Sequence, residues 1–184
     1  MIGERWVAHG PRPRVSAGPE ESVAAMSLPS TEPFRREQLD LLGHVERLPV
    51  SAHELQSMLV DERIELMEEV VAFIAEMLLP HVEVEERVLY PGADRLLGDA
   101  GNGGATAHVR REARARMAEL AAADPADPGA VQEILYALHA LLWVHLEHEA
   151  EVYLKLIQTQ ADEPVRRLFS RVAEQSGAGT PTAS

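Results

Sequence analysis

The chain has 184 residues, of which 46% are hydrophobic and only 4% aromatic, a balance that favours one all-α domain packed through aliphatic side chains. It has no cysteine, which excludes disulfides, thiolate zinc sites and iron–sulfur clusters and leaves imidazole and carboxylate as the groups for any metal. The net charge of −13 argues against a nucleic-acid partner and an anionic membrane surface, and no apolar run approaches the roughly 20 residues of a spanning helix.

The two ends of the chain differ in composition from its middle. Residues 1–32 are rich in Pro, Arg, Gly and Ser, which predicts a disordered leader, and residues 176–184 predict a disordered tail. Residues 33–175 are then the folded domain. Because the N-terminal residues lack the apolar stretch of a secretory signal, we expect a cytoplasmic protein.

Hydrophobic periodicity and the positions of Pro and Gly predict the helices between these ends. The glycine-rich residues 98–104 separate the second helix from the third, and Asp127 is placed to cap the fourth. The predicted helices cover residues 34–48 with a kinked extension past Pro49 to 59, residues 61–90 ending before Pro91, residues 106–123, residues 127–160, and a short amphipathic helix that begins at Asp162.

Two of these helices carry ionisable residues on the face expected to be buried. In the second helix, apolar residues recur at steps of three and four, and then His81 and Glu85 take the same positions. In the fourth helix, the same pattern leads to His145 and Glu149. The full series are Ile64, Met67, Val71, Ile74, Leu78, His81, Glu85 and Val88, and Val131, Ile134, Leu138, Leu141, His145, Glu149 and Val152.

A His and a Glu four residues apart lie on one face of a helix, so each pair can offer a nitrogen and an oxygen to one point. Burying a carboxylate without a partner is unfavourable, and a cation is an effective compensation. Two such pairs on two bundle helices can place two carboxylates between two cations, as in di-iron carboxylate bundles. A single pair is as readily explained by packing or solvation, so the prediction depends on the set.

An internal repeat extends the predicted set. His81 follows His44 by 37 positions, and His145 follows His108 by the same interval. The chain therefore resembles two helical hairpins related by a pseudo-twofold. We predict metal ligation by His44, His81, Glu85, His108, His145 and Glu149.

At these residues the sequence resembles the hemerythrin-like, or HHE cation-binding, domain family, over about residues 34–160. The segment His81–Pro91 is similar to the family's His-x-x-x-Glu-Glu-x-x-Leu-Tyr-Pro segment, and a second similarity runs from Leu135 through Glu149. The resemblance implies an up-down four-helix bundle with a non-haem di-iron centre bridged by carboxylates. Family centres bind oxygen, store or sense iron, or respond to oxygen species and nitric oxide. Zinc or manganese would also suit these ligands.

The first helix departs from the family pattern. Where family members commonly carry a His ligand, this chain has Gln38, whereas His44 lies one place off the apolar series. The 37-residue interval favours His44 as the ligand, and the phase of the helix favours a site that lacks one imidazole; both readings stay open. The apolar series is Gln38, Leu41, Val45, Leu48, Ala52 and Leu55.

Three further side chains lie near the predicted site. His148 is either a fifth His ligand or a solvated residue. Tyr90 and Tyr153 could donate hydrogen bonds to the site, although core packing explains them equally well.

The functional prediction is a metal-binding protein that acts in oxygen, redox or nitric oxide response or in iron handling, with metal ions and O2, NO or peroxide as its ligands. One alternative is a di-iron enzyme acting on peroxide or a small substrate. Another is a structural bundle with a degenerate metal site, for which Gln38 is the evidence. No motif defines a substrate, so binding or sensing is favoured over catalysis.

Overall fold

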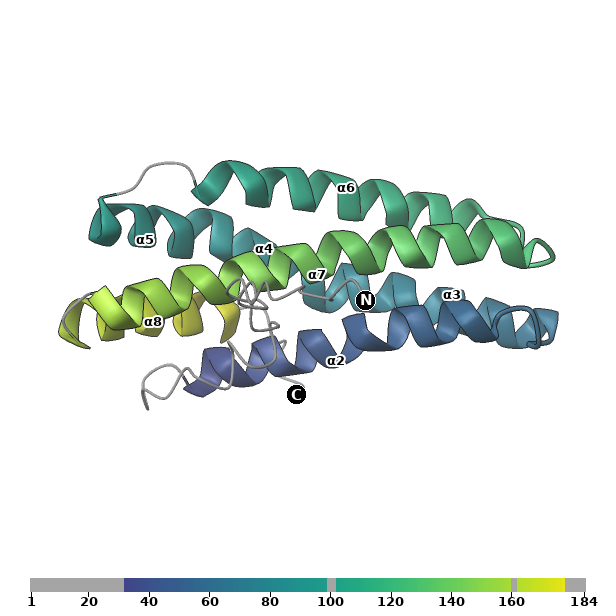
Figure 1. The fold of residues 1–184 in the computed structure, drawn as a ribbon, viewed down its shortest axis with the longest axis horizontal. Coiled ribbons are helices and arrows are strands. Elements are labelled where there is room, and N and C mark those ends of the chain that lie inside the picture. The colour runs from purple at the N-terminus through teal and green to yellow at the C-terminus, as the bar shows by residue number, and fades with distance from the viewer. Residues whose placement is uncertain (1–31, 99–101, 160–161, 178–184) are drawn as a thin grey trace, which may run out of the picture.

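The computed structural model describes residues 32–98, 102–159 and 162–177, so the predicted leader up to residue 31 and most of the predicted tail lie outside the described residues. Within these ranges the chain is helical and contains no strand. Four long helical segments run up and down along one axis, and a fifth helix packs at one end (Figure 1). The elements are α2 (Glu32–Glu54), α3 (Val60–Phe73), α4 (Leu79–Val84), α5 (Tyr90–Leu97), α6 (Asn102–Ala122), α7 (Pro128–Thr159) and α8 (Asp162–Gly177).

Helix α2 buries the predicted apolar series along its whole length. All six residues from Gln38 to Leu55 that were expected to face inward are buried, which confirms the phase of this helix. Pro49 lies inside the helix, which continues to Glu54 and is followed by a turn rather than by a helical extension to residue 59. The inward face is therefore continuous across Pro49, since Ala52 and Leu55 beyond it are buried as well.

The second long segment is a continuous helix from Val60 to Leu97 with two π-helical turns, η2 (Ile74–Leu78) and η3 (Glu85–Leu89). The prediction that it ends before Pro91 is wrong. Each wide turn comes two residues before a proline, Pro80 or Pro91, at the start of the next α-helical part. A widened turn accommodates a residue that lacks a backbone N–H and crowds the preceding turn. The helix ends at Gly98, whose φ of 68° is a left-handed terminating conformation.

The wide turns also change which residues of this helix face inward. Met67, Ile74 and Leu78 are buried as predicted, whereas Ile64 is 39% exposed. The prediction placed inward-facing residues alternately three and four positions apart, which assumes a constant number of residues per turn. A π turn contains more residues than an α-helical turn and so breaks this spacing. The predicted face is therefore correct near the middle of the helix and wrong at its beginning.

Helices α7 and α8 form as the turn and cap residues predict. Asp127 Oδ1 accepts hydrogen bonds from the backbone N–H groups of Gly129 and Ala130, each at 3.1 Å, and so caps α7. Helix α8 extends two residues beyond the predicted domain boundary at residue 175. It buries its apolar face in the bundle through Val165, Leu168, Phe169 and Val172.

Two hydrophobic cores follow one another along the bundle. On α7 the first core ends at Leu146, and the second begins at Val152. On the second helical segment the first core ends at Val82 and the second begins at Val84. Ionisable residues of these helices thus lie where the two cores meet.

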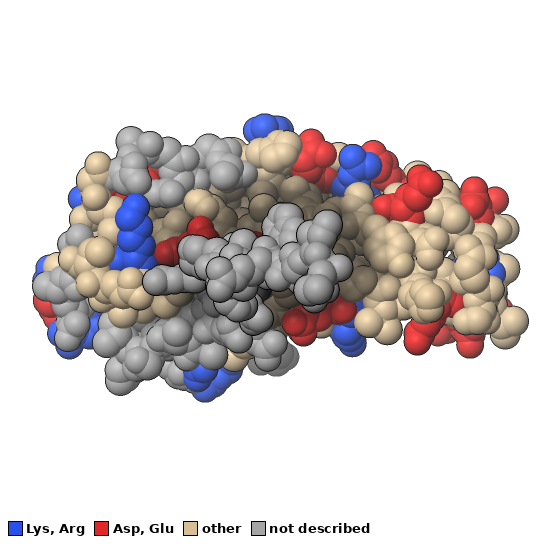
Figure 2. All heavy atoms as spheres, in the orientation of Figure 1, with Lys and Arg blue, Asp and Glu red and all other residues tan. Residues whose placement is uncertain are grey.

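On the face that Figure 2 shows, the acidic side chains are unevenly distributed. Asp and Glu side chains gather at the end of the molecule where α2 leads into α3 and α6 leads into α7 (Figure 2). Among the described residues, no helix is both long and apolar enough to cross a bilayer.

Candidate metal centre

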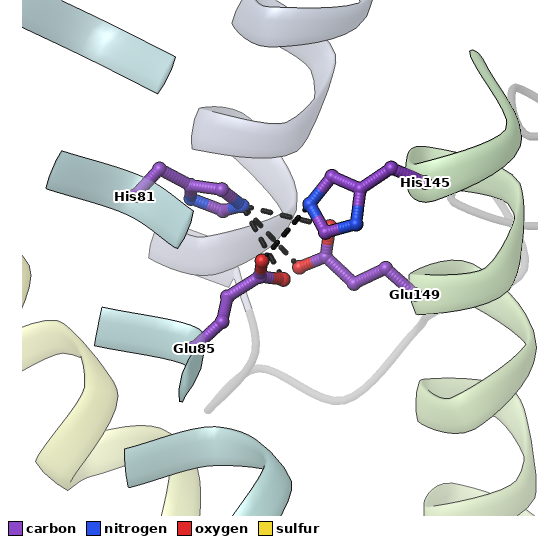
Figure 3. Close-up of side chains that lie close together, drawn as sticks. All are labelled: His81, Glu85, His145 and Glu149. Atoms are coloured by element: carbon purple, nitrogen blue, oxygen red, sulfur yellow. Dashed lines mark hydrogen bonds and ion pairs between the residues drawn. The ribbon is translucent and has the colours of Figure 1, made fainter. Parts of the chain in front are cut away.

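Four buried ionisable side chains from two helical segments meet inside the bundle (Figure 3). His81 comes from α4 and Glu85 from the start of η3, whereas His145 and Glu149 come from consecutive turns of α7. Their exposed fractions are only 3%, 1%, 4% and 0%. One ligand atom from each residue lies within 4.8 Å of all the others. The two His-x-x-x-Glu pairs therefore converge as the sequence predicts.

The carboxylate of Glu85 lies between the two imidazoles. Its Oε1 is 3.5 Å from His81 Nε2, and its Oε2 is 3.0 Å from His145 Nε2. The carboxylate of Glu149 lies beside that of Glu85, with Oε1 3.4 Å from His81 Nε2 (Figure 3). Each Glu85 oxygen thus faces a different histidine, which is the placement that a bridging carboxylate requires.

Burial and mutual charge shift the pKa values of the cluster in different directions. Burial lowers the pKa of His81, but the charges of Glu85 and Glu149 outweigh it and raise this pKa well above its usual value. Burial raises the pKa of Glu85, but His145 and His81 outweigh it and hold this pKa well below its usual value. Burial and the charge of Glu85 raise the pKa of Glu149 to about 8. Burial lowers the pKa of His145, but the charge of Glu85 outweighs it and raises this pKa as well, so the metal-free cluster holds protons on both imidazoles and on Glu149.

Two residues of α2 hold His81 from the side opposite Glu149. Its Nδ1 donates to Glu37 Oε1 at 3.1 Å, and its ring stacks on Phe34 with a centroid separation of 5.9 Å. With Nδ1 engaged, Nε2 is the nitrogen left to bind a metal. The sequence analysis did not identify Glu37 or Phe34, because the meeting of α2 with α4 depends on how the helices pack.

Two tyrosines accompany the carboxylates. Tyr153 donates its hydroxyl to Glu149 Oε1 at 3.0 Å, so for this residue the structure favours the hydrogen bond that the sequence analysis left open. Burial and the charge of Glu149 raise the pKa of Tyr153, so this hydroxyl keeps its proton and remains a donor. Tyr90 is fully buried, and burial followed by the charges of Glu85 and Glu149 raises its pKa as well.

The structure does not bring the other predicted histidines into this cluster. The ring of His44 is half-buried, stacks on Phe73 at 4.7 Å and approaches Arg47, with Nδ1 2.8 Å from Nη2. His108 is exposed on α6, and the ring of His148 stacks on Tyr90 at 6.3 Å. The position of His44 follows from its place on α2, beside the buried series rather than in it. Ligation by His44 and His108 stays a prediction without support from their placement.

The donor set of the cluster fits a metal cation. Both Glu85 oxygens and His145 Nε2 are buried without a hydrogen-bond partner among the described residues, although each is close to an opposite partial or full charge. Metal–nitrogen and metal–oxygen bonds are about 2.0–2.2 Å long, so donors around one cation lie up to about 4.4 Å apart. The observed spacing of at most 4.8 Å approaches this limit with small side-chain movements. Metal cations bound among these side chains would satisfy the unpaired donor atoms.

Comparison with known proteins agrees with this chemistry. The family model described as hemerythrin HHE cation binding domain matches residues 35–157. The match extends from α2 almost to the end of α7 and so includes all four cluster residues. No curated protein and no solved structure gives a match to the chain.

Proposed function

Because the chain belongs to the hemerythrin HHE cation-binding domain family, we propose that its buried cluster holds a non-haem di-iron centre used in oxygen, redox or nitric oxide response or in iron handling. The proposed ligands are His81, Glu85, His145 and Glu149. Zinc or manganese would be accepted by the same donors, so iron rests on the family and on the proposed redox role.

The observation that carries the di-iron proposal is the orientation of Glu85. Its two oxygens face His81 and His145 separately, at 3.5 and 3.0 Å, so this carboxylate can bridge two cations that each bind one imidazole. Glu149 supplies the second carboxylate and is oriented by the hydroxyl of Tyr153. Bound iron would supply reversible one-electron chemistry and affinity for small oxygen and nitrogen-oxide ligands.

The side chains around the cluster determine what such a centre could do. One imidazole and two shared carboxylates leave each cation short of six donors, which favours access for a small ligand. The hydroxyl of Tyr153 orients Glu149, and the carboxylate of Glu37 orients His81. The two hydrophobic cores enclose the cluster from both directions along the bundle.

Metal loading tests the proposal. Metal-free protein is loaded with Fe²⁺ without oxygen, freed of excess metal and analysed for iron, then oxidised and examined by near-ultraviolet absorption. The proposal predicts two irons per chain and charge-transfer absorption after oxidation, both lost in His81→Ala. The proposal would be contradicted if the wild-type protein bound no iron, or if His81→Ala bound as much iron as the wild type.

A hollow beside His81 favours one second candidate function, a peroxide-consuming enzyme. This hollow has a volume of about 490 Å³ and is lined by Pro80, His81 and Val84 together with residues of α2 and of the end of α8. It offers a small molecule an approach to the cluster from the side of Glu37. Two molecules of hydrogen peroxide would give two of water and one of O2. Iron-loaded protein that consumes peroxide no faster than His81→Ala would exclude this activity.

A further inference from the structure

Gln38 on α2 is a buried amide that lacks the partners such a group requires. Its side chain is 1% exposed, and neither Oε1 nor Nε2 has a hydrogen-bond partner in the part of the chain that the structure describes. An amide buried in this way is unfavourable unless a ligand satisfies it. By contrast, Gln132 on α7 donates Nε2 to the carbonyl of Ala52 at 2.7 Å.

The neighbours of Gln38 place it next to the metal cluster. One turn before it, Phe34 stacks on His81 and packs against Tyr153, with centroids 4.4 Å apart in the latter pair. The preceding residue, Glu37, accepts the hydrogen bond from His81 Nδ1. Helix α2 passes directly behind the four clustered side chains (Figure 3). Gln38 lies on the same buried face of α2 as Phe34 and faces the interior at this level.

We propose that the side-chain amide of Gln38 points into the His81, Glu85, His145 and Glu149 cluster and supplies its carbonyl oxygen as a neutral ligand to one of the two proposed cations, as the fifth donor side chain of the cluster. This inference rests on the proposed metal-binding function. An amide oxygen adds a donor without adding a third buried negative charge beside Glu85 and Glu149. It also explains why a polar residue interrupts an otherwise apolar face of α2.

The substitution Gln38→Leu separates this role from simple packing. Leu is slightly larger and has no polar atoms, so it removes an unsatisfied amide from the metal-free protein. The thermal midpoint of metal-free Gln38→Leu should equal or exceed that of the wild type. Its affinity for Co²⁺, a probe that needs no oxygen chemistry, should fall at least tenfold.

The matched control is Gln132→Leu, which removes an amide that is satisfied and that bonds to Ala52 near the end of α2. This variant should have a lower thermal midpoint and unchanged Co²⁺ affinity. The second informative variant is Gln38→His, which exchanges the oxygen donor for a nitrogen donor. It should still bind Co²⁺, with a visible absorption spectrum that differs from that of the wild type because the ligand atom has changed.

The outcomes distinguish this inference from the proposed function. If the wild type binds Co²⁺ and Gln38→Leu binds it equally well, Gln38 is a packing residue and only the inference is overturned. If Gln38→His gives the same Co²⁺ spectrum as the wild type, the inference is likewise overturned. This spectrum tests the inference even if Gln38→Leu fails to fold. If the wild type itself binds no metal, both are overturned.

Discussion

The Nδ1 atom of His81 lies 3.1 Å from Glu37 Oε1, so one imidazole connects a carboxylate on α2 with the buried carboxylates beyond its Nε2. Glu37 is partly exposed, whereas His81 is buried, and the hydrogen bond fixes both the tautomer and the direction of the ring.

Removal of this partner should weaken metal binding without removing a ligand. We expect Glu37→Ala to lower Co²⁺ affinity by about tenfold, because a histidine ligand that loses its partner is less basic and less well oriented. The control is Glu46→Ala, an exposed glutamate on the same helix, which should leave the affinity unchanged. Isothermal titration of both variants measures the difference, and equal affinities would argue against an orienting role for Glu37.

Metal affinity should increase with pH. The pKa of Glu149 is raised to about 8 by burial and by Glu85, and the carboxylates also raise the pKa of His81, so both groups hold protons near neutral pH. A cation must displace these protons, so binding releases protons and tightens as the pH rises toward 8. Titrations between pH 6 and 9 in buffers of different ionisation enthalpy measure both effects. A pH-independent affinity with no proton release would contradict the proposed competition.

The four histidines of the repeat should separate into two groups. His81→Ala and His145→Ala remove clustered ligands and should abolish tight metal binding, whereas His44→Ala and His108→Ala should leave metal content unchanged because these side chains lie elsewhere. Elemental analysis after equilibrium dialysis measures metal content per chain. Loss of metal in His44→Ala or His108→Ala would favour the ligand set predicted from the repeat.

Two glycines should respond oppositely to alanine. A Cβ at Gly92 would overlap the side chain of Leu168 in α8, so Gly92→Ala should destabilise the fold by about 1–3 kcal/mol through overpacking. A Cβ at Gly43 meets nothing within 4 Å, so Gly43→Ala should stabilise α2 by up to about 1 kcal/mol. Urea unfolding of the metal-free variants measures both values. Equal stability of Gly92→Ala and the wild type would mean that α8 packs less closely on α5 than described.

The sequence predicts the central pairs of the site because each pair is local. His81 with Glu85 and His145 with Glu149 each need only the geometry of one helix, and the apolar residues before them show which face is buried. The helix beyond Pro91 could not be predicted, because the π turns that accommodate the two prolines have no clear sequence signal.

Residues that join the site from another helix were harder to predict. Glu37 lies beside the buried face of α2 and reaches His81 only because α2 packs against the start of α4 at that level. His44 was included because of a regular interval in the sequence, yet an interval does not determine which side of a helix a residue occupies. Gln38 is the reverse case, since its phase on α2 correctly predicts burial and its chemistry depends on the neighbouring helices.

Anomalous diffraction at the iron edge, from crystals grown with Fe²⁺ without oxygen, tests the central claim most directly. The account predicts two anomalous peaks inside the bundle, each at about 2.0–2.2 Å from one of His81 Nε2 and His145 Nε2, with Glu85 between them. Anomalous density at His44 or His108, or none within bonding distance of the four clustered side chains, would contradict it.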